Sequence, residues 1–361
     1  MKIKKGSIFF KKDAYQILNF YLNHHIDDRS NLFILVDNIT EKYCIPILFH
    51  SIDLLKRSHI IRIQTGEKEK NIHTCIQICN QLERWKANRK SLILNLGGGV
   101  ITDIGGFVSS IFKRGIRFIN IPTTLLGMVD ASIGGKTGVN LNTVKNEIGS
   151  FYSPEFLIID INFLQTLSNE EILSGMAEML KHGLISDRSF WIKMKNLFYI
   201  EKIHEKNVIT NKKKWESLIS QSILIKKNIV DHDPQEKGLR KILNFGHTIG
   251  HALESYFIMN NQKITHGKAI AMGMICESFI SNKINGLSMQ DYKEINFIFS
   301  KLYSLEKNQI CEREIDHLFP IMENDKKNEN NQILFSLLKR IGECLYNCPV
   351  SYSLIKKSFM Y

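Results

Sequence analysis

Short apolar runs alternate with amphipathic stretches through the first half of the chain. Five runs have the length of strands, whereas stretches such as residues 71–85 carry apolar positions at helical spacing. This alternation predicts a parallel sheet covered by helices on both faces, with ligands bound at the carboxyl ends of the strands. The predicted strands are Leu32 to Val36, His59 to Gln64, Leu92 to Leu96, Phe118 to Ile121 and Phe156 to Ile159.

From about Ser168 onward the pattern favours helix. Prolines are scarce there, and Pro234 falls between two predicted helices. We therefore predict an α/β nucleotide-binding domain with a Rossmann-like parallel sheet over residues 1–168, and an all-α metal-binding domain over residues 169–361. The predicted helices are Asn169 to Gly183, Lys214 to Val230, Ile242 to Tyr256, His266 to Ile284 and Asp291 to Tyr303.

Composition narrows the class of protein. With 361 residues, 43% of them hydrophobic, the chain can bury a large core, and no apolar run approaches the roughly 18 residues of a membrane helix. The seven cysteines are scattered without a Cys-x-x-Cys pair, so we expect reduced thiols. Cys75 with Cys79 and Cys344 with Cys348 lie four apart, a spacing that would let each pair share a helix face as metal or redox partners, but we interpret all four as ordinary helical residues. Because the chain has no membrane helix and lysines break its first residues before a secretory apolar core, we expect a cytoplasmic protein. The formal charge of +12 accompanies Lys, Asn and Ile that are abundant throughout. We attribute this charge to background composition and expect no nucleic-acid or membrane partner.

A triple glycine follows the third predicted strand. Gly97, Gly98 and Gly99 would let backbone amides approach a phosphate closely at the start of a helix. The pattern is not Gly-x-Gly-x-x-Gly, so a plain tight turn is the alternative. Asp37, which ends the first strand, and the turn at 66–70 after the second strand are suited to ribose hydroxyls or are ordinary surface groups.

A second glycine-containing segment, Gly134-Gly135-Lys136-Thr137, resembles a P-loop. The first glycine of that motif would fall on Asp130, and no strand leads directly into the loop. We reject an ATPase and keep Lys136 as a candidate anion ligand. Asp103, in the first turn of the helix after the triple glycine, is a candidate helix cap.

Histidines and a carboxylate on predicted helices indicate a zinc site. His247 and His251 are four residues apart and would share one helical face, with His266 fifteen residues further on and Glu178 upstream. Zinc accepts such ligands and keeps a fourth position open for substrate. The pattern does not decide which imidazole binds metal and which transfers protons. Glu178 would equally form a simple ion pair with Lys181.

A set of cations accompanies these groups, each beside glycine, asparagine or a motif residue. We expect several of them to bind a polyanionic substrate through charge-assisted hydrogen bonds of about 1.5 to 3 kcal/mol each. The cations are Arg114, Lys136, Lys145, Lys181, Lys226 and Arg240.

Together these segments resemble 3-dehydroquinate synthase, an enzyme family of the shikimate pathway. The resemblance runs from about Gly66 to Lys327, with the motifs in the family's order. The motifs are Gly66-Glu67-x-x-Lys70, Gly97-Gly-Gly-Val-x-x-Asp103, Arg114-Gly115, Pro122-Thr-Thr-Leu-Leu126, Asp130 with Gly134-Gly-Lys-Thr, Lys145-Asn146, Glu178-x-x-Lys181 and Arg240-x-x-x-Asn244-x-Gly-His-x-x-Gly-His251.

The resemblance implies an NAD-binding first domain, a helical second domain and an active site in the cleft between them. It assigns zinc, or cobalt, to Glu178, His247 and His266, which leaves His251 to transfer protons. Lys136 and Lys145 are placed where cofactor and substrate meet. The residues placed against NAD are Asp37, Thr65, Gly66, Glu67, Lys68, Glu69, Lys70, Gly99, Val100, Ile101, Thr102, Asp103, Thr123, Thr124, Phe163, Leu164, Gln165 and Thr166.

The substrate implied by the resemblance is 3-deoxy-D-arabino-heptulosonate 7-phosphate, a carboxylated sugar phosphate. NAD oxidises the C5 alcohol, phosphate leaves, the retained NADH reduces the ketone, and ring opening with aldol closure gives 3-dehydroquinate without net oxidation. The implied enzyme is a carbon–oxygen lyase and a homodimer, with Arg114 supplied across the dimer interface. Further residues implied in catalysis or substrate binding are Asp130, Lys181, Asn146, Lys226, Arg240, Asn244 and one of Lys326 or Lys327.

Three positions depart from the family's usual pattern: Thr102 replaces a glycine, Ser168 a proline and Pro234 an acidic residue. Thr102 is expected to weaken cofactor binding if its backbone needs positive φ, which a β-branched residue disfavours. The alternative functions are another sugar-phosphate cyclase or a metal-dependent polyol dehydrogenase on the same architecture. A basic nucleic-acid-binding module is an alternative from a different class.

Overall fold

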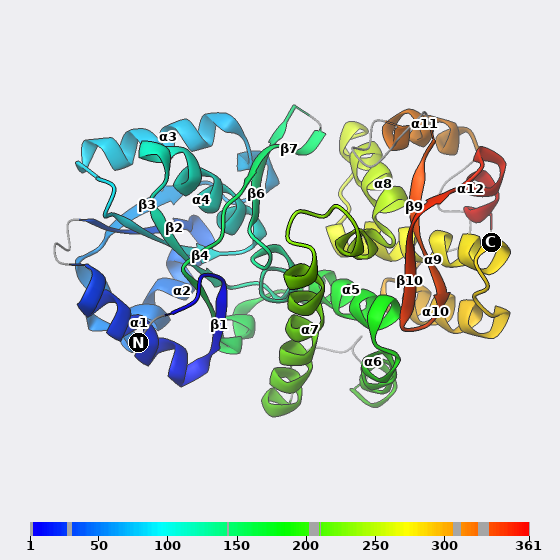
Figure 1. Cartoon of the computed structure of the whole chain (residues 1–361), viewed down its shortest axis with the longest axis horizontal. Coiled ribbons are helices and arrows are strands. Elements are labelled where there is room, and N and C mark those ends of the chain that lie inside the picture. Colours follow the sequence, from blue (N-terminus) through cyan, green and yellow to red (C-terminus); the bar gives the residue numbers. More distant parts are fainter. Residues whose placement is uncertain are drawn as a thin grey trace. The chain divides into compact units, whose positions relative to one another are not determined.

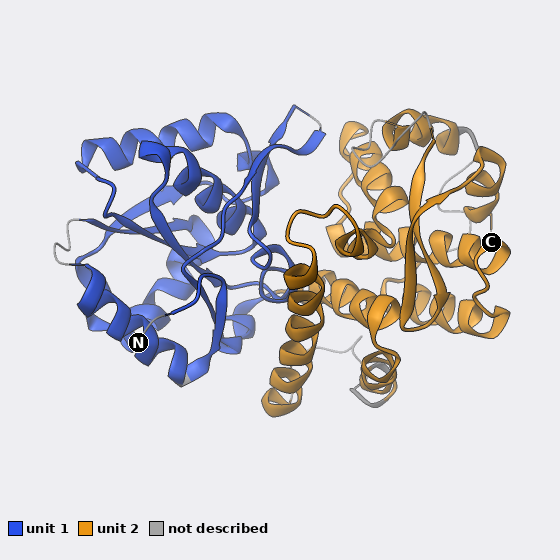
Figure 2. Cartoon of the chain, viewed as in Figure 1, with its two compact units in different colours: residues 1–167 blue, residues 168–361 orange. Residues whose placement is uncertain are grey.

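The computed structural model describes residues 3–26, 31–142, 144–201, 209, 211–305, 312–323 and 332–360. The chain divides into two compact units, Met1–Leu167 and Ser168–Tyr361 (Figure 2). None of the helices in the described ranges is long and apolar enough to cross a membrane. The assignment of a nucleotide-binding role to one half and a metal-binding role to the other stays a prediction.

A six-stranded parallel sheet forms the framework of the first unit, as the alternating pattern predicted (Figure 1). Its strand order is β1-β8-β5-β4-β2-β3. Every predicted strand is present within one or two residues of its predicted bounds, whereas β1, a run of only four residues, was not predicted. The strands are β1 (Ser7–Phe10), β2 (Leu32–Asp37), β3 (His59–Ile63), β4 (Leu92–Gly97), β5 (Arg117–Pro122) and β8 (Phe156–Ile159).

Helices cover both faces of this sheet. Helices α1 and α2 lie on one face, and α3 and α4 lie on the other (Figure 1). On the second face, Ile78 of α3 and Ile104 of α4 are fully buried in one core cluster with Phe33 and Leu35 of β2. The helices are α1 (Lys11–His25), α2 (Asn38–Ser51), α3 (Ile72–Arg84) and α4 (Gly99–Ile111).

The neighbouring strands β2 and β4 lead into helices on opposite faces. From β2 the chain continues outward to β3, whereas from β4 it continues in the other direction to β5. In this class of fold, such a reversal opens a crevice at the carboxyl ends of the strands, where nucleotides bind. Asp37 ends β2, and Gly98 is the N-cap residue of α4 directly after β4. The glycine turn and the first carboxylate therefore lie at the reversal.

An antiparallel hairpin, which the pattern did not predict, belongs to the same unit. Strand β6 (Lys136–Leu141) pairs with β7 (Val144–Phe151). The hairpin packs on α4 where Gly106 leaves space, because a Cβ there would lie 2.4 Å from Cγ2 of Thr137. The hairpin carries two of the predicted anion ligands, Lys136 and Lys145.

Helices dominate the second unit, as predicted. An antiparallel pair of strands, β9 (Leu334–Arg340) and β10 (Glu343–Pro349), was not predicted. Cys344 and Cys348 consequently lie on a strand, and their interpretation as helical residues was wrong. The helices are α5 (Asn169–Ser186), α6 (Arg188–Glu201), α7 (Lys212–His232), α8 (His247–Met259), α9 (His266–Ile284), α10 (Met289–Leu302), α11 (Glu312–Glu323) and α12 (Tyr352–Ser358).

Glycines bring three helices of the second unit into backbone contact. A Cβ on Gly273 of α9 would lie 2.0 Å from the carbonyl oxygen of Gly246 and 2.8 Å from the nitrogen of Gly250. A Cβ on Gly267, at the start of α9, would lie 2.4 Å from Cα of Ser174 on α5. No side chain fits at these distances, so the separations of α8 and α5 from α9 are set by the backbones themselves.

A methyl group added at Gly273 tests whether α8 and α9 need direct backbone contact. We expect Gly273→Ala to lower the free energy of unfolding by about 3 kcal/mol or more, because overpacking against a backbone oxygen cannot be relieved by a rotamer change. Urea unfolding measures the effect. The control is Ser278→Ala, a fully buried position on the same helix, which adds no volume. Equal stability of the two variants would show that the crossing tolerates a side chain.

Candidate active site

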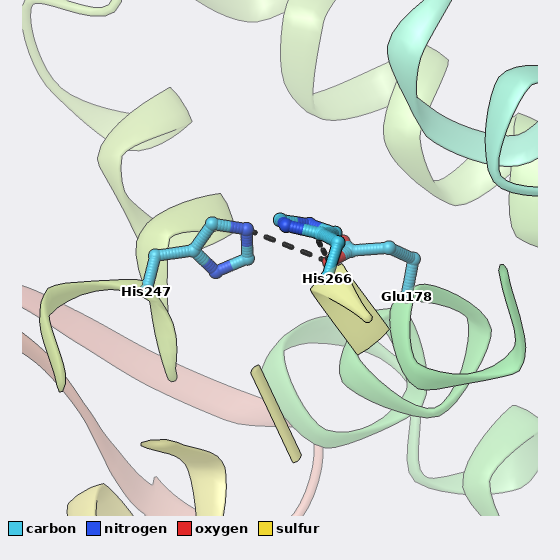
Figure 3. Close-up of side chains that lie close together, drawn as sticks. All are labelled: Glu178, His247 and His266. Carbon is cyan, nitrogen blue, oxygen red and sulfur yellow. Dashed lines mark ion pairs between the residues drawn. The ribbon is translucent and has the colours of Figure 1, made fainter. Parts of the chain in front are cut away.

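Glu178 of α5, His247 of α8 and His266 of α9 converge in the second unit (Figure 3). Oε1 of Glu178 lies 3.5 Å from Nε2 of His247 and 3.6 Å from Nε2 of His266. One ligand atom from each of the three residues lies within 4.8 Å of the others. Zinc bonds of about 2.0 to 2.2 Å in tetrahedral geometry bring ligand atoms to about 3.4 Å from one another. The three residues therefore fit a single zinc ion and leave its fourth position for a substrate.

Hydrogen bonds at the other ring nitrogens orient both imidazoles. Nδ1 of His247 lies 3.1 Å from the carbonyl oxygen of Phe245. Nδ1 of His266 lies 3.4 Å from Oε2 of Glu254. When Nδ1 donates its hydrogen, the Nε2 lone pair points toward the shared centre, as is usual for zinc-binding histidines.

Glu178 forms an ion pair through its second oxygen. Lys181, one helical turn further along α5, contacts Oε2 of Glu178, and both side chains are buried. A buried carboxylate needs such compensation. The ion pair and metal ligation, which the sequence left as alternatives, use different oxygens and are compatible.

The carboxylates around His266 favour its protonated form when no metal is bound. Burial lowers the pKa of this imidazole, but the carboxylates of Glu254 and Glu178 outweigh burial and raise the pKa to about 9. A metal ion and a proton therefore compete for this ring.

His251 lies one turn beyond His247 on α8. The centroid of its ring is 5.0 Å from that of His247 and 6.0 Å from that of His266. Geometry also groups His251 with Glu254 and His266, since one ligand atom from each lies within 4.8 Å of the others. Its half-buried side chain stands beside the predicted metal ligands, and its role in proton transfer stays a prediction.

Helix α8, which carries His247 and His251, begins directly after a break in the helical backbone at Gly246. The pattern predicted one helix from Ile242 to Tyr256, but Gly246, with φ of 80°, interrupts it. Glu277 of α9 supplies the cap that this glycine lacks: its carboxylate accepts hydrogen bonds from the backbone nitrogens of Gly246 at 2.6 Å and Ile249 at 3.3 Å. Glu277 was not predicted, and the available signal was a carboxylate inside an apolar helical stretch, which is rarely buried without a partner.

Two predicted substrate ligands, Arg240 and Asn244, lie in the short 3-10 helix Leu239–Asn244 that precedes α8, and the head groups of both form hydrogen bonds within the protein. Nη1 of Arg240 donates to the carbonyl oxygen of Pro234 at 2.6 Å, and Nδ2 of Asn244 donates to Oε1 of Glu236 at 2.7 Å. Asp233 fixes the start of this 3-10 helix by accepting hydrogen bonds from the backbone nitrogens of Lys237, Gly238 and Arg240. Although desolvation raises the pKa of Asp233, these amides outweigh it and lower the pKa.

In the first unit, five predicted ligands of cofactor or substrate are joined into one polar network by Asn140. Its Nδ2 donates to Oε1 of Glu67 at 2.9 Å, and its Oδ1 accepts a hydrogen bond from the backbone nitrogen of Asn146 at 3.0 Å. Nζ of Lys70 lies 2.6 Å from Oδ2 of Asp103 and 2.6 Å from Oδ1 of Asn146. Nζ of Lys145 lies 3.8 Å from Oε1 of Glu67. Burial raises the pKa of Asp103, and Lys70 offsets part of that rise. The prediction that Asp103 caps the helix was wrong, because Gly98 is the N-cap residue and Asp103 pairs with Lys70.

Asp37 and Thr102 have local structural roles. Oδ1 of Asp37 caps α2 by accepting hydrogen bonds from the backbone nitrogens of Ile39 at 2.9 Å and Thr40 at 2.8 Å. Thr102 lies inside α4, and its hydroxyl donates to the carbonyl oxygen of Gly99 at 3.1 Å. Helical backbone has negative φ, so the strain expected at Thr102 does not arise.

Burial limits how Phe163 and Leu164 can meet a ligand. Both side chains are buried in the core, so only their backbones can face the cofactor. Gly66, with φ of 119°, opens the turn at 66–70, and Oγ1 of Thr124 accepts a hydrogen bond from Gly127 at 3.0 Å.

The other predicted residues differ in exposure. Lys326 and Lys327 lie outside the described residues. Thr123, Ile101 and Lys226 are buried, and Val100, Glu69 and Asp130 are partly buried. The exposed residues are Thr65, Lys68, Arg114, Lys136, Gln165 and Thr166.

Family models match consecutive parts of the chain. The model described as 3-dehydroquinate synthase N-terminal matches residues 60–174, and the model described as 3-dehydroquinate synthase C-terminal matches residues 175–328. The chain belongs to the 3-dehydroquinate synthase family. A curated 3-dehydroquinate synthase from Parabacteroides distasonis is 42% identical over 329 residues, which cover 91% of this chain and 90% of that relative.

Two solved structures have the same fold as this chain. A 2-epi-5-epi-valiolone synthase from Streptomyces hygroscopicus with NAD+ and Zn2+ bound has a TM-score of 0.82 at 21% identity, covering 99% of this chain and 96% of that one. A 2-deoxy-scyllo-inosose synthase complexed with carbaglucose-6-phosphate, NAD+ and Co2+ has a TM-score of 0.79 at 24% identity, covering 99% of each chain. These likenesses confirm the predicted fold class.

Metal content separates the roles of the two histidines on α8. We expect His247→Ala to lose bound zinc and activity, because it removes one of three ligand atoms. His251→Ala should lose activity and keep the metal. Zinc is measured by elemental analysis of the purified variants. Equal loss of zinc in both variants would contradict the assignment of His247 and His251.

Proposed function

We propose that this chain is a 3-dehydroquinate synthase, which converts 3-deoxy-D-arabino-heptulosonate 7-phosphate to 3-dehydroquinate and phosphate with NAD and Zn2+ or Co2+. Membership of the family supports the reaction. The observation that carries the site is the convergence of Glu178, His247 and His266 around one point. Solved relatives with NAD+ and with Zn2+ or Co2+ support the cofactors.

Glu178, His247 and His266 would hold the metal, with Lys181 fixing the second oxygen of Glu178. When bound, the metal polarises the alcohol oxygen of the substrate, while NAD takes up and returns a hydride. The chain's own task is to hold these ligand atoms at fixed separations. It does so through the backbone contacts of α8 and α5 with α9, which hold the buried Glu178 and His247 and the partly buried His266 close together.

We assign proton transfer to His251. An imidazole titrates near neutral pH and can accept and return a proton. Its place on the same face of α8 as His247 supports the assignment, since a proton acceptor must lie near the atom that the metal polarises. Asp130 and Lys181 are proposed to act in catalysis on the strength of the family motifs.

We assign the anionic groups of the substrate to basic and amide side chains of the family motifs. Arg240 and Asn244 already form hydrogen bonds within the protein, so less conformational entropy is lost when they bind a ligand. Lys136 is exposed at the start of β6, where it can meet a solvated anion. The proposed substrate ligands are Arg114, Lys136, Lys145, Asn146, Lys226, Arg240, Asn244 and Lys327.

We assign NAD to the crevice at the carboxyl ends of β2 and β4, where the chain leaves these neighbouring strands in opposite directions. The backbone amides at the start of α4 favour a phosphate, because a helix N-terminus carries partial positive charge. The turn at 66–70 and the polar network around Lys70 line the same edge of the sheet.

We also propose a homodimer in which each subunit contributes Arg114 across the interface, on the strength of the family resemblance.

We propose a cytoplasmic location for the protein. The six cysteines in the described ranges are free, as is usual in a reducing compartment. Burial raises the pKa of Cys75 and of Cys276 to about 12, so neither thiol is reactive at neutral pH.

Product analysis tests the reaction. The protein incubated with the heptulosonate phosphate and NAD should release phosphate, and because the hydride returns to the same substrate, NADH should not accumulate. Treatment with a chelator should abolish phosphate release, and added zinc should restore it. Stoichiometric formation of NADH without phosphate release would favour a polyol dehydrogenase.

Lys136 provides a test of anion binding. We expect Lys136→Met to lower kcat/KM roughly thirty- to a thousandfold, since loss of a charged hydrogen bond and of electrostatic stabilisation costs about 2 to 4 kcal/mol. The unfolding free energy should barely change, because an exposed lysine contributes little to stability. Lys42→Met, an exposed lysine on α2, is the matched control. If both variants keep the kcat/KM of the unmodified enzyme, Lys136 does not bind the substrate.

A further inference from the structure

A carboxylate that is neither a proposed metal ligand nor a proposed substrate ligand lies directly behind the metal site. Glu254 of α8 is 4% exposed, and its Oε2 lies 3.4 Å from Nδ1 of His266. His251 is three residues earlier and lies on the same face of the helix. A buried carboxylate is retained only where it is paired, because burial strips it of water. The pairing of Glu254 with His266 therefore calls for a function.

His266 depends on an outside contact for its orientation. It is the first residue of α9, directly after the N-cap residue Thr265. The residues before it, 262–265, form no helix or strand. Its imidazole can rotate about two side-chain torsions, and only some of the resulting orientations direct Nε2 toward Glu178 and His247. The carboxylate of Glu254, held on the rigid neighbouring helix, selects these orientations by accepting the hydrogen of Nδ1.

We propose that Glu254 is a positioning residue, which holds His266 with Nε2 directed at the metal and thereby strengthens metal binding. The inference rests on the proposed metal set of Glu178, His247 and His266. In this role Glu254 acts through the imidazole of His266.

The competing role for Glu254 is that of a direct ligand. Glu254, His251 and His266 also have ligand atoms within 4.8 Å of one another, so a second ion is geometrically conceivable there. His266 would then have to bind ions through both nitrogens. A ring binds two ions only after losing both of its N–H protons, which is unfavourable at neutral pH. A single ion with Glu254 behind His266 is therefore the simpler arrangement.

Metal affinity tests the positioning role without reliance on turnover. Metal-free Glu254→Ala and Glu254→Gln are titrated with Zn2+ against a chromophoric chelator, and the visible spectrum of each Co2+-loaded variant is recorded. We expect the zinc dissociation constant to rise roughly 10- to 100-fold in Glu254→Ala, the usual range for loss of a group behind a ligand. Glu254→Gln should show a smaller rise, since its amide oxygen can still accept the hydrogen of Nδ1. The Co2+ bands should shift as the imidazole reorients.

A matched control removes another carboxylate that contacts the same helix. Oε1 of Glu314 accepts a hydrogen bond from the hydroxyl of Tyr256 on α8 at 3.2 Å. Glu314→Gln should leave zinc affinity and the Co2+ spectrum unchanged, even if it lowers stability. An equal loss of zinc affinity in Glu314→Gln and Glu254→Gln would overturn the positioning role, because a general weakening of α8 would then account for both.

Two further outcomes decide the inference. If His247→Ala loses zinc while Glu254→Ala binds it with unchanged affinity and an unchanged Co2+ spectrum, Glu254 does not position His266 and the proposed metal set still stands. If the unmodified protein binds two zinc ions and Glu254→Ala loses only one of them, Glu254 is a ligand and its positioning role is wrong. Retention of zinc by His247→Ala would instead defeat the proposed metal set, and this inference with it.

Discussion

The backbone contact of α8 and α5 with α9 is the constraint on which the candidate metal site depends. Gly246, Gly250 and Gly273 remove the side chains that would separate α8 from α9, and Gly267 does the same between α9 and α5. His247 and His266 are the first residues of their helices, so these contacts set the separation of the two imidazoles. Larger residues at the glycines would displace the ligand atoms by more than a metal bond tolerates.

Where α8 and α9 cross, the partial positive charges of the two helix N-termini are offset by buried carboxylates. A helix N-terminus carries partial positive charge, which favours a neutral imidazole over a protonated one. Glu178 and Glu254 act in the opposite direction, and their effect prevails at His266, whose pKa they raise to about 9 although burial lowers it. Glu277 directs its charge at the backbone amides of α8. A divalent cation would offset the carboxylates that the protein has buried here, which explains how such groups are retained.

The sequence predicted elements with a strong local period and missed those that depend on pairing between distant segments. Strands β2 to β5 and helix α9 follow from apolar runs and helical spacing, and their ends agree closely with the structure. Strands β9 and β10 contain charged residues and carry no clear alternation, so only their mutual pairing identifies them. The hairpin of β6 and β7 was missed for the same reason, since much of β7 is exposed and apolar positions do not mark it.

The same distinction applies to the candidate site. The spacing of His247 and His251 indicates a shared helical face, and the family motifs supply Glu178 and His266. Glu254 and Glu277 were missed because their functions arise from contacts between helices: Glu254 reaches His266 twelve residues away, and Glu277 reaches Gly246 thirty-one residues away. A motif records which residues touch the ligand, whereas the packing of helices determines which residues hold them. A carboxylate within an apolar helical stretch is therefore the sequence feature that indicates such supporting residues, because a carboxylate is rarely buried without a partner.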